Sequence, residues 1–292
     1  MKPLPWMKSA EAASIVPRLR AAPRSVLMLD YDGTLAPFQL EPGRAYPYPG
    51  VEHRLAALAG LASVRLVLVS GRPVQALAEL LETRMGGKFK VEIWGNHGRE
   101  HLGIDGTYEL EPLDEREQAA LERVKSEIGR MGFLRSVEAK PASLAVHWRG
   151  FDPAAQKELR AAIESLYAAH AQQSNLQLLA FDGGLELRSD RRNKGAAVAH
   201  VLAEEEPGVP AAYLGDDITD EDAFRTMGDR GFSILVREEV RDSAAPFWIR
   251  PPEELLQFLD RWIEGSGTPR QKAALASAEA GDLGAGLKES DQ

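Results

Sequence analysis

The sequence predicts an α/β fold, a doubly wound parallel sheet with a smaller α+β unit of αββαββ order inserted into it. Over most of the chain, short continuous apolar runs alternate with helical patterns, which is typical of parallel strands buried on both faces. Between about residue 105 and residue 190, helical patterns instead alternate with pairs of strands. That change favours an antiparallel sheet with two helices on one face.

Five apolar runs are the expected strands of the large sheet: Val26–Leu29, Leu66–Val69, Val91–Trp94, Ala211–Leu214 and Phe232–Val236. The helical patterns between them include Val51–Leu61, Pro73–Thr83, Gly195–Glu205 and Glu221–Met227. Because strand and helix alternate, the sheet is expected to carry helices on both faces.

The inserted unit is expected to contain helices at Asp114–Met131 and Pro153–His170, with strand pairs within Val137–Trp148 and Leu176–Leu187. Asp182-Gly183-Gly184 has the composition of a hairpin turn. We therefore expect a discontinuous core domain at residues 1–104 and 191–264 and a cap domain at residues 105–190. Residues 265–292 have few large apolar side chains and are expected to be a disordered tail, in which Gln271–Ala280 could form a marginal helix.

Composition excludes several classes of function. Acidic residues outnumber basic ones 44 to 35 and no block of Lys and Arg occurs, so neither a nucleic acid nor a membrane surface is an expected partner. The chain has no cysteine, which excludes disulfides, thiolate metal sites and cysteine nucleophiles. The first residues resemble neither a signal peptide nor a membrane span, and a cytoplasmic location is expected.

Four expected strands end in polar residues. They are followed by Asp30-Tyr31-Asp32-Gly33-Thr34, Ser70-Gly71-Arg72, Asn96-His97-Gly98 and Gly215-Asp216-Asp217. The carboxyl ends of parallel strands lie on one edge of the sheet, where such folds bind ligands. Groups distant in sequence are therefore expected to share one site.

The first of these segments suggests phosphoaspartate chemistry. Asp30 follows directly on a buried strand and is the expected nucleophile. Asp32 is placed to protonate the leaving oxygen and then to deprotonate the attacking water. An isolated match could instead be an ordinary Asx turn. An EF-hand loop is excluded because Gly33 stands fourth, not sixth, from Asp30.

The acidic segment after the fourth of these strands predicts a magnesium site, since several carboxylates beside Asp30 need a cation to stay ionised. The expected ligands are the side chains of Asp30 and Asp216 and the main-chain carbonyl of Asp32. Asp217 and Asp220 are expected to orient the ligands or Lys194. The alternative is that this segment only caps a helix.

Ser70, Gly71 and Arg72 are the expected phosphate-binding residues, followed by a helix N-terminus that favours anions. Alone, such a segment is usually a loop. Lys194 is expected to neutralise charge during phosphoryl transfer, although a lysine before a helix is more often exposed.

Taken together, these segments resemble the four motifs of the haloacid dehalogenase (HAD) superfamily, which implies a HAD-like core and a phosphoaspartate mechanism with Mg²⁺. The insertion resembles the cap of the branch that contains trehalose 6-phosphate phosphatases. Further segments resemble that group: residues 95–98, 138–143, 147–149, 185–188 and 193–195. The resemblance covers roughly residues 24 to 260.

The resemblance also implies how a sugar would be bound. Glu138, Lys140 and Glu186 would bind hydroxyls from the cap, and His97 and Asn193 would meet the ligand from the core. His147 and Arg149 belong to the resembling segments and are further candidates. The alternative is a solvated face with cross-strand ion pairs, on which His147 would simply be exposed.

The leading hypothesis is a small-molecule phosphatase that hydrolyses trehalose 6-phosphate in trehalose biosynthesis. Sucrose 6-phosphate or a glycosyl phosphoglycerate are alternative substrates, and a phosphotransferase or mutase would use the same phosphoaspartate. A non-catalytic sensor is disfavoured because Asp30, Asp32, Lys194 and Asp216 are all present. The sequence leaves open whether a trehalose 6-phosphate synthase binds.

Overall fold

The computed structural model describes residues 1–39, 41–85, 89–140, 143–148, 150–171, 176–181, 183–189 and 192–267. Within these ranges, no helix is both long enough and apolar enough to cross a membrane. The expected turn at Asp182, the candidate ligand Arg149 and the expected tail beyond residue 267 lie outside the described residues.

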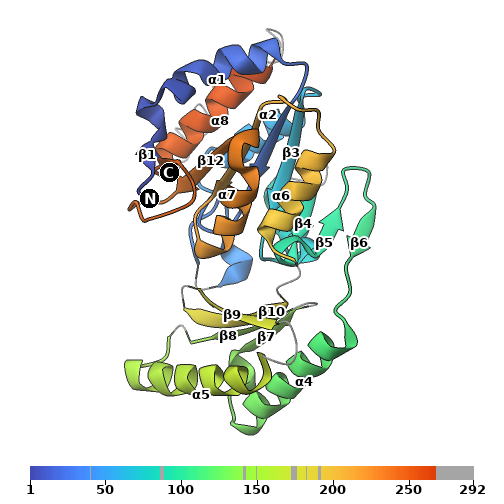
Figure 1. The fold of residues 1–292 in the computed structure, drawn as a ribbon, viewed down its shortest axis with the longest axis vertical. Helices are drawn as coiled ribbons and strands as arrows, with labels where there is room; N and C mark the ends of the chain where they lie inside the picture. The colour runs from blue at the N-terminus through green and yellow to red at the C-terminus, as the bar shows by residue number, and fades with distance from the viewer. Residues whose placement is uncertain are drawn as a thin grey trace, which may run out of the picture.

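A nine-stranded sheet forms the centre of the larger part of the molecule (Figure 1). The strand order is β1-β13-β12-β11-β2-β3-β4-β5-β6. Neighbours from β1 to β4 in this order are parallel, whereas β5 and β6 are antiparallel. The strands are β1 Leu4–Pro5, β2 Ser25–Leu29, β3 Val64–Val69, β4 Glu92–Gly95, β5 Glu100–Leu102, β6 Tyr108–Leu110, β11 Ala211–Gly215, β12 Phe232–Val236 and β13 Phe247–Ile249.

Helices cover both faces of this sheet: α1 Ala10–Ala21, α2 Val51–Ala59, α3 Val74–Met85, α6 Lys194–Ala203, α7 Glu221–Met227 and α8 Glu253–Ser266. Successive strand residues point to opposite faces. Leu27 and Leu29 of β2 therefore share a core with α1, α2, α3 and α8, whereas Val26 and Met28 share one with α6 and α7. Burial on both faces explains the continuous apolar runs, and the predicted doubly wound sheet is confirmed.

The N-terminal segment and the C-terminal helix add elements that the sequence patterns did not predict. Ser9 begins α1 by accepting a hydrogen bond from the Ala12 amide, and Pro17 lies within the helix. Trp6 is fully buried and packs edge-on against Phe232. Helix α8 packs on α1 and includes residues 265 and 266. The start of the tail predicted at residue 265 is therefore two residues too early.

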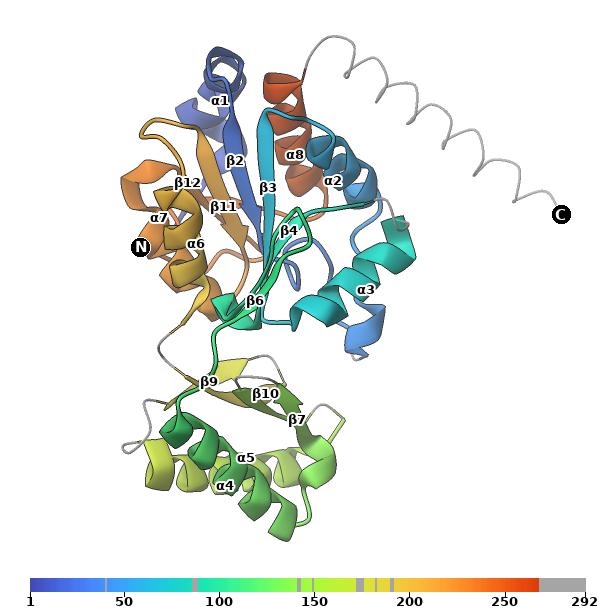
Figure 2. The same ribbon diagram turned by 90° about the vertical axis from the view of Figure 1, so that its right-hand side faces the viewer.

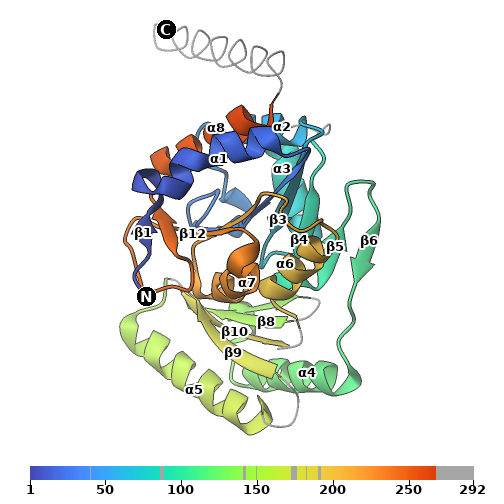
Figure 3. The same ribbon diagram turned by 45° about the horizontal axis from the view of Figure 1, so that its top comes forward.

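A smaller four-stranded antiparallel sheet has the order β7-β8-β10-β9. Its strands are β7 Val137–Lys140, β8 Ser143–His147, β9 Leu176–Phe181 and β10 Gly184–Ser189, and its helices are α4 Glu115–Arg130 and α5 Pro153–Ala171. The observed order of elements matches the predicted αββαββ unit. Figures 2 and 3 show this sheet between the large sheet and helices α4 and α5.

The two faces of the small sheet have different chemistry because of strand register. Leu144, Val146, Leu185 and Leu187 share a core with α4 and α5. On the opposite face, Glu186 is paired in register with Ala145, which is paired with Glu138, while Lys140 is paired with Ser143. The polar side chains therefore face the large sheet.

Strand β6 of the large sheet lies beyond residue 104, where the cap was predicted to begin, and the exact domain limits stay a prediction.

Candidate functional site

The polar ends of β2, β3, β4 and β11 meet at one edge of the large sheet, opposite the polar face of the small sheet. Between them lies a cleft of about 500 Å³. The core side contributes Asp30, Asp32, Gly71, Arg72, His97, Lys194, Asp216 and Asp217, and the cap side contributes Glu138, Lys140, His147, Phe181 and Glu186. The structure thus brings together residues from every motif that the sequence singled out.

Asp30 is held from three directions at the end of β2. Its amide donates to the carbonyl of Leu214 over 2.9 Å, which extends the pairing of β2 with β11. Lys194 Nζ donates to Asp30 Oδ1 over 2.6 Å, and the Thr34 hydroxyl donates to Oδ2 over 2.9 Å. Asp30 and Lys194 are both buried. The carboxylate is therefore fixed in position before any ligand arrives.

Electrostatics at Asp30 reflect the balance between burial and Lys194. Burial raises the pKa of Asp30 to about 7, although Lys194 acts in the opposite direction. Burial alone would lower the pKa of Lys194, but Asp220 and Asp30 outweigh it and raise that pKa, so the lysine stays charged. Burial, followed by repulsion from Asp30, raises the pKa of Asp216 well above its usual range. Among the described residues, the positive charges of Lys194 and Arg237 beside these carboxylates do not offset their burial, since the pKa values of Asp30 and Asp216 stay raised.

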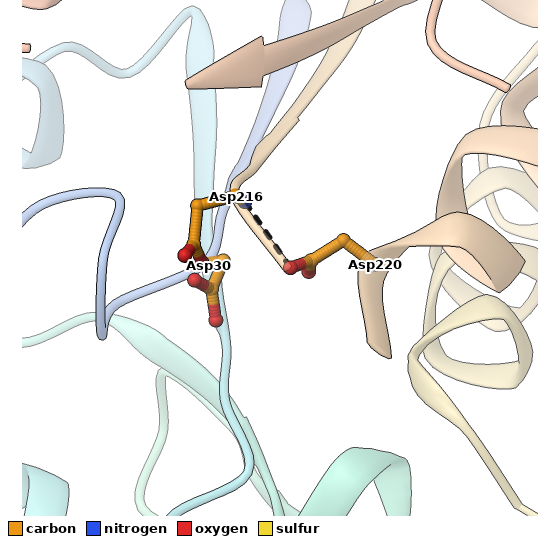
Figure 4. A group of neighbouring side chains, drawn as sticks. All are labelled: Asp30, Asp216 and Asp220. Carbon is orange, nitrogen blue, oxygen red and sulfur yellow. Dashed lines mark hydrogen bonds between the residues drawn. The ribbon is translucent and has the colours of Figure 1, made fainter. Parts of the chain in front are cut away.

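Asp30, Asp216 and Asp220 form a compact group in which one oxygen of each lies within 4.8 Å of the others (Figure 4). Asp216 Oδ1 is buried and has no hydrogen-bond partner among the described residues. Asp220, in contrast, is fully engaged. Its Oδ1 accepts from Lys194 over 2.7 Å and from the Tyr213 hydroxyl over 2.5 Å, and its Oδ2 accepts from the amides of Asp216 and Asp217.

This difference separates a possible metal ligand from a positioning residue. The free oxygen of Asp216 and the crowded carboxylate of Asp30 suit a hard divalent cation, which prefers oxygen ligands. Asp220 has no free oxygen to offer and instead orients Lys194 and the loop after β11. Asp217 lines the cleft and forms a capping box with Asp220 at the short helix that follows.

Gly33 makes the approach of Asp216 to Asp30 possible. Its φ is +83°, and a Cβ at this position would lie 2.1 Å from Asp216 Oδ2. Any side chain would therefore displace the carboxylate as well as strain the turn. This explains the glycine after the two aspartates in physical terms.

Asp32 and Arg72 form an ion pair at the mouth of the site. Arg72 donates from Nε to Asp32 Oδ2 and from Nη2 to Oδ1, each over 2.6 Å. Burial alone would lower the pKa of Arg72, but its hydrogen bonds to the Asp32 carboxylate outweigh burial and raise that pKa. The guanidinium is thus directed at the expected acid–base residue.

Ser70 and Gly71 have different positions relative to the cleft. Ser70 is fully buried, and its hydroxyl accepts from the Arg72 amide over 3.1 Å. Gly71 lines the cleft, and a Cβ there would lie 2.6 Å from the ring of His97. The glycine therefore lets His97 reach the cap.

A buried polar cluster joins the cap to the core. Glu186 accepts from Lys140 over 3.2 Å and from the Ser143 hydroxyl over 2.6 Å, and its Oε2 lies 3.1 Å from His97 Nε2. Lys140 also donates to the carbonyl of Gly71 over 3.4 Å. We refer to these five residues as the inner cluster. They hold donors and acceptors beside the edge of the large sheet at which Asp30 and Gly71 lie.

Charge within the inner cluster is governed by burial and by Lys140. Burial lowers the pKa of His97 to about 4, so the imidazole is neutral near pH 7. Burial alone would raise the pKa of Glu186, but Lys140 and His97 outweigh it and hold it well below its usual range. Lys140 and Glu186 therefore remain an ion pair.

The remaining expected ligands lie farther out or serve local structure. His147 Nε2 lies 2.9 Å from Glu138 Oε2 in a partly exposed pair. The side chain of Asn193 accepts from the Ala196 amide over 3.0 Å and so caps α6. Both pairs leave the ligand-binding role of these residues a prediction.

Four residues in or beside the site were not assigned a role from the sequence. They are Thr34, Ser143 and Tyr213, whose hydroxyls bind Asp30, Glu186 and Asp220, and Glu100, which is buried. Glu100 accepts from the Val74 amide over 2.6 Å and from Asn96 Nδ2 over 2.7 Å. Thr34 and Ser143 stand within the motif segments, whereas no sequence signal identifies Tyr213 or Glu100.

A model of the trehalose-phosphatase family matches residues 28–247. The chain belongs to the trehalose-phosphatase family. The match includes the ends of β2, β3, β4 and β11, the whole cap and Lys194.

Individual relatives agree with this assignment. The chain is 31% identical over 253 residues to a trehalose-phosphate phosphatase of Mycobacterium marinum, covering 82% of this chain and 61% of that protein. It is 29% identical over 258 residues to a probable trehalose-phosphate phosphatase of Arabidopsis thaliana, covering 82% and 67%. The chain thus spans only about three fifths of the length of its mycobacterial relative.

The fold is shared with solved structures. The C-terminal domain of a trehalose-6-phosphate phosphatase from C. albicans superposes with a TM-score of 0.74 at 20% identity, covering 90% of this chain and 98% of that chain. A haloacid dehalogenase-like hydrolase from Bacteroides thetaiotaomicron superposes with a TM-score of 0.56 at 17% identity, covering 82% and 99%. The HAD-like fold with a cap is therefore confirmed.

Proposed function

We propose that this protein hydrolyses trehalose 6-phosphate to trehalose and phosphate through a phosphoaspartate at Asp30. The observation that carries the proposal is a buried carboxylate, bound by Lys194, in a cleft whose other side offers mixed donors and acceptors. Phosphoryl transfer needs positioned charge on one side, and a polyol needs hydrogen bonds on the other. Family membership supports the choice of trehalose 6-phosphate.

Asp30 would attack the phosphorus atom as the substrate oxygen departs. Strand pairing, Thr34 and Lys194 hold the carboxylate in place, so little ordering is left to the moment of reaction. Lys194 would also keep the nucleophile ionised and neutralise charge on the phosphoryl group. Asp220 would act through Lys194 as a positioning residue.

A magnesium ion fits the residues that are present. The side chains of Asp30 and Asp216 and the main-chain carbonyl of Asp32 would hold it, since Asp216 Oδ1 has no other partner among the described residues. Asp217 would line the cleft beside these ligands. When bound, the ion would neutralise charge on the phosphoryl oxygens and let Asp30 and Asp216 ionise together.

Asp32 would protonate the leaving sugar oxygen and later accept a proton from the hydrolytic water. Arg72 now occupies both of its oxygens. A phosphoryl group arriving beside Gly71 would compete for that guanidinium, because Arg binds phosphate as readily as carboxylate. Substrate binding would thereby release Asp32 for proton transfer, with Ser70 supporting the Arg72 amide.

The cap would bind the sugar and close the site. We propose that the cap consists of residues 105–190 and the core of residues 1–104 with 191–264. The sugar would be bound from the cap by Glu138, Lys140, His147, Arg149 and Glu186, and from the core by His97 and Asn193. Polar contacts that join the units beside the cleft include Lys140 to Gly71 and His97 to Glu186. Hydroxyl groups could replace such contacts when substrate enters.

The test is phosphate release from trehalose 6-phosphate, sucrose 6-phosphate, glucose 6-phosphate and a glycosyl phosphoglycerate, each with Mg²⁺ and with EDTA. We expect Mg²⁺-dependent release that is fastest with trehalose 6-phosphate. Faster release from another ester would be consistent with the phosphoaspartate mechanism but would reject trehalose 6-phosphate as the substrate. Phosphate passed to an added sugar rather than to water would indicate a phosphotransferase.

The variant Asp30→Asn tests the mechanism, because it keeps the shape of the side chain and removes the nucleophile. We expect loss of turnover with a cooperative thermal transition like that of the wild type. Substantial remaining activity would reject the phosphoaspartate.

A further inference from the structure

The cleft is longer than its catalytic end requires. Besides the charged residues, it is lined by Pro73, which precedes α3, and by Ala76, Leu80 and Thr83 of α3. These positions lie three or four residues apart and so share one face of the helix. With a rise of about 1.5 Å per residue, they extend the cleft by roughly 15 Å from the phosphate-binding segment.

Among the described residues, the phenylalanine and tyrosine side chains that line this cleft are Phe38, Tyr46 and Phe181, which belong to none of the catalytic motifs and which we call the aromatic wall. Phe38 and Tyr46 come from the core loop after β2 and are 44% and 38% exposed. Arg84 near the C-terminal end of α3 stacks over Tyr46, 4.9 Å from the ring centroid. Tyr46 therefore lies at the far end of the helix face that lines the cleft.

Phe181 contributes to the wall from the cap. It lies opposite Gly184 in the register of β9 and β10, and a Cβ at Gly184 would lie 2.1 Å from its ring. The ring thus lies over Gly184, on the face of the small sheet that carries Glu186 and looks toward the core. It also packs edge-on against His147, with centroids 5.3 Å apart.

The cap face is therefore divided into two regions. Within the inner cluster, Glu186, Ser143 and His97 are buried, and Lys140, whose side chain is 13% exposed, donates to the carbonyl of Gly71. Glu138, His147 and Phe181 form a more exposed outer region. A ligand anchored by its phosphate beside Asp30 would meet the inner cluster first and the outer region second.

We propose that the aromatic wall packs against the second, unphosphorylated ring of a disaccharide phosphate and selects it over a monosaccharide phosphate. The proposal rests on the proposed function and adds the part of the chain that sets substrate length. The apolar C–H face of a pyranose ring can cover an aromatic face, while its hydroxyl groups reach Glu138 and His147 at the rim. A single-ring substrate would leave the wall in water and gain nothing from it.

The experiment compares Phe181→Ala and Tyr46→Ala with the wild type on trehalose 6-phosphate and on glucose 6-phosphate. We expect kcat/KM for the disaccharide ester to fall roughly 10- to 30-fold, as for the loss of a well-packed apolar contact. The value for glucose 6-phosphate should stay within about 2-fold, because that ester ends before the wall. Calorimetric binding of trehalose 6-phosphate to Asp30→Asn, with and without Phe181→Ala, should show the same loss without turnover.

Two controls separate packing from folding. Tyr108→Ala removes an aromatic side chain that is 54% exposed on β6 and does not line the cleft, and it should leave both esters unaffected. Phe181→Tyr keeps the ring and should retain the preference. Equal losses on both esters, or no loss on either, would overturn the proposal while the wild-type activity stands. A wild type that releases phosphate from neither ester would instead reject the proposed function itself.

Discussion

Replacing Lys194 with methionine gives the sharpest test of the catalytic electrostatics. The lysine side chain is 4% exposed and lies between the buried carboxylates of Asp30 and Asp220, at 2.6 and 2.7 Å. Methionine keeps most of the length but leaves these carboxylates without their cation. Breaking such a buried pair typically costs about 3–5 kcal/mol. In a protein of this size, that loss lowers the melting temperature by roughly 5–15 °C.

The assay is thermal unfolding at pH 8 in EDTA, with Lys157→Met at an exposed position of α5 as the matched control. The control should melt within about 1 °C of the wild type, since exposed substitutions rarely change stability much. The deficit of Lys194→Met should shrink at pH 5.5, because Asp30, whose pKa is already raised to about 7, then binds a proton and needs no cation. A variant that melts with the wild type at pH 8 would refute the reasoning.

Two further outcomes test the inner cluster and the metal site. Because burial lowers the pKa of His97 from 6.5 to about 4, the unfolded chain binds more protons between these values, and the contribution of His97 to stability should fall by roughly 3 kcal/mol as the pH drops from 6.5 to 4. His97→Gln should reduce this fall in urea titrations at pH 7 and pH 4.5, and an unchanged fall would contradict the assignment. Gly33→Ala should abolish the rise in melting temperature caused by Mg²⁺, because its Cβ would meet Asp216. Gly106→Ala has a similar φ of +88° but no atom within 4 Å, so it should be destabilised and still respond to Mg²⁺; equal responses would reject the site.

Much of the fold could be predicted because its signals are local. The β2 run around Leu27 and the β11 run before Asp216 are apolar at every position, which indicates strands covered on both sides. In a parallel sheet, that alone brings the residues after such strands to one edge. Asp30, Asp216 and His97 could therefore be placed in one site without any knowledge of side-chain contacts.

Other elements carry no such local signal. Helix α1 contains Pro17, and the residues before it include two prolines, so its sequence favours a loop. It forms because its apolar side packs against α8, more than 200 residues away in the chain. The β5–β6 hairpin is short and its outer strand is exposed, so its pattern does not predict a sheet edge.

The sequence by itself determined the order of the central strands and the helices between them, the inserted cap and the residues that gather at the polar edge of the large sheet, because periodicity and strand ends are properties of neighbouring positions. Only the tertiary structure decided which charges pair. Arg72 binds Asp32 across 40 positions, Tyr213 and Lys194 share Asp220, and Asp216 Oδ1 has no hydrogen-bond partner in the described part of the chain. Such pairings depend on burial and on distances of a few ångströms between segments far apart in the chain, and no spacing in the sequence encodes them.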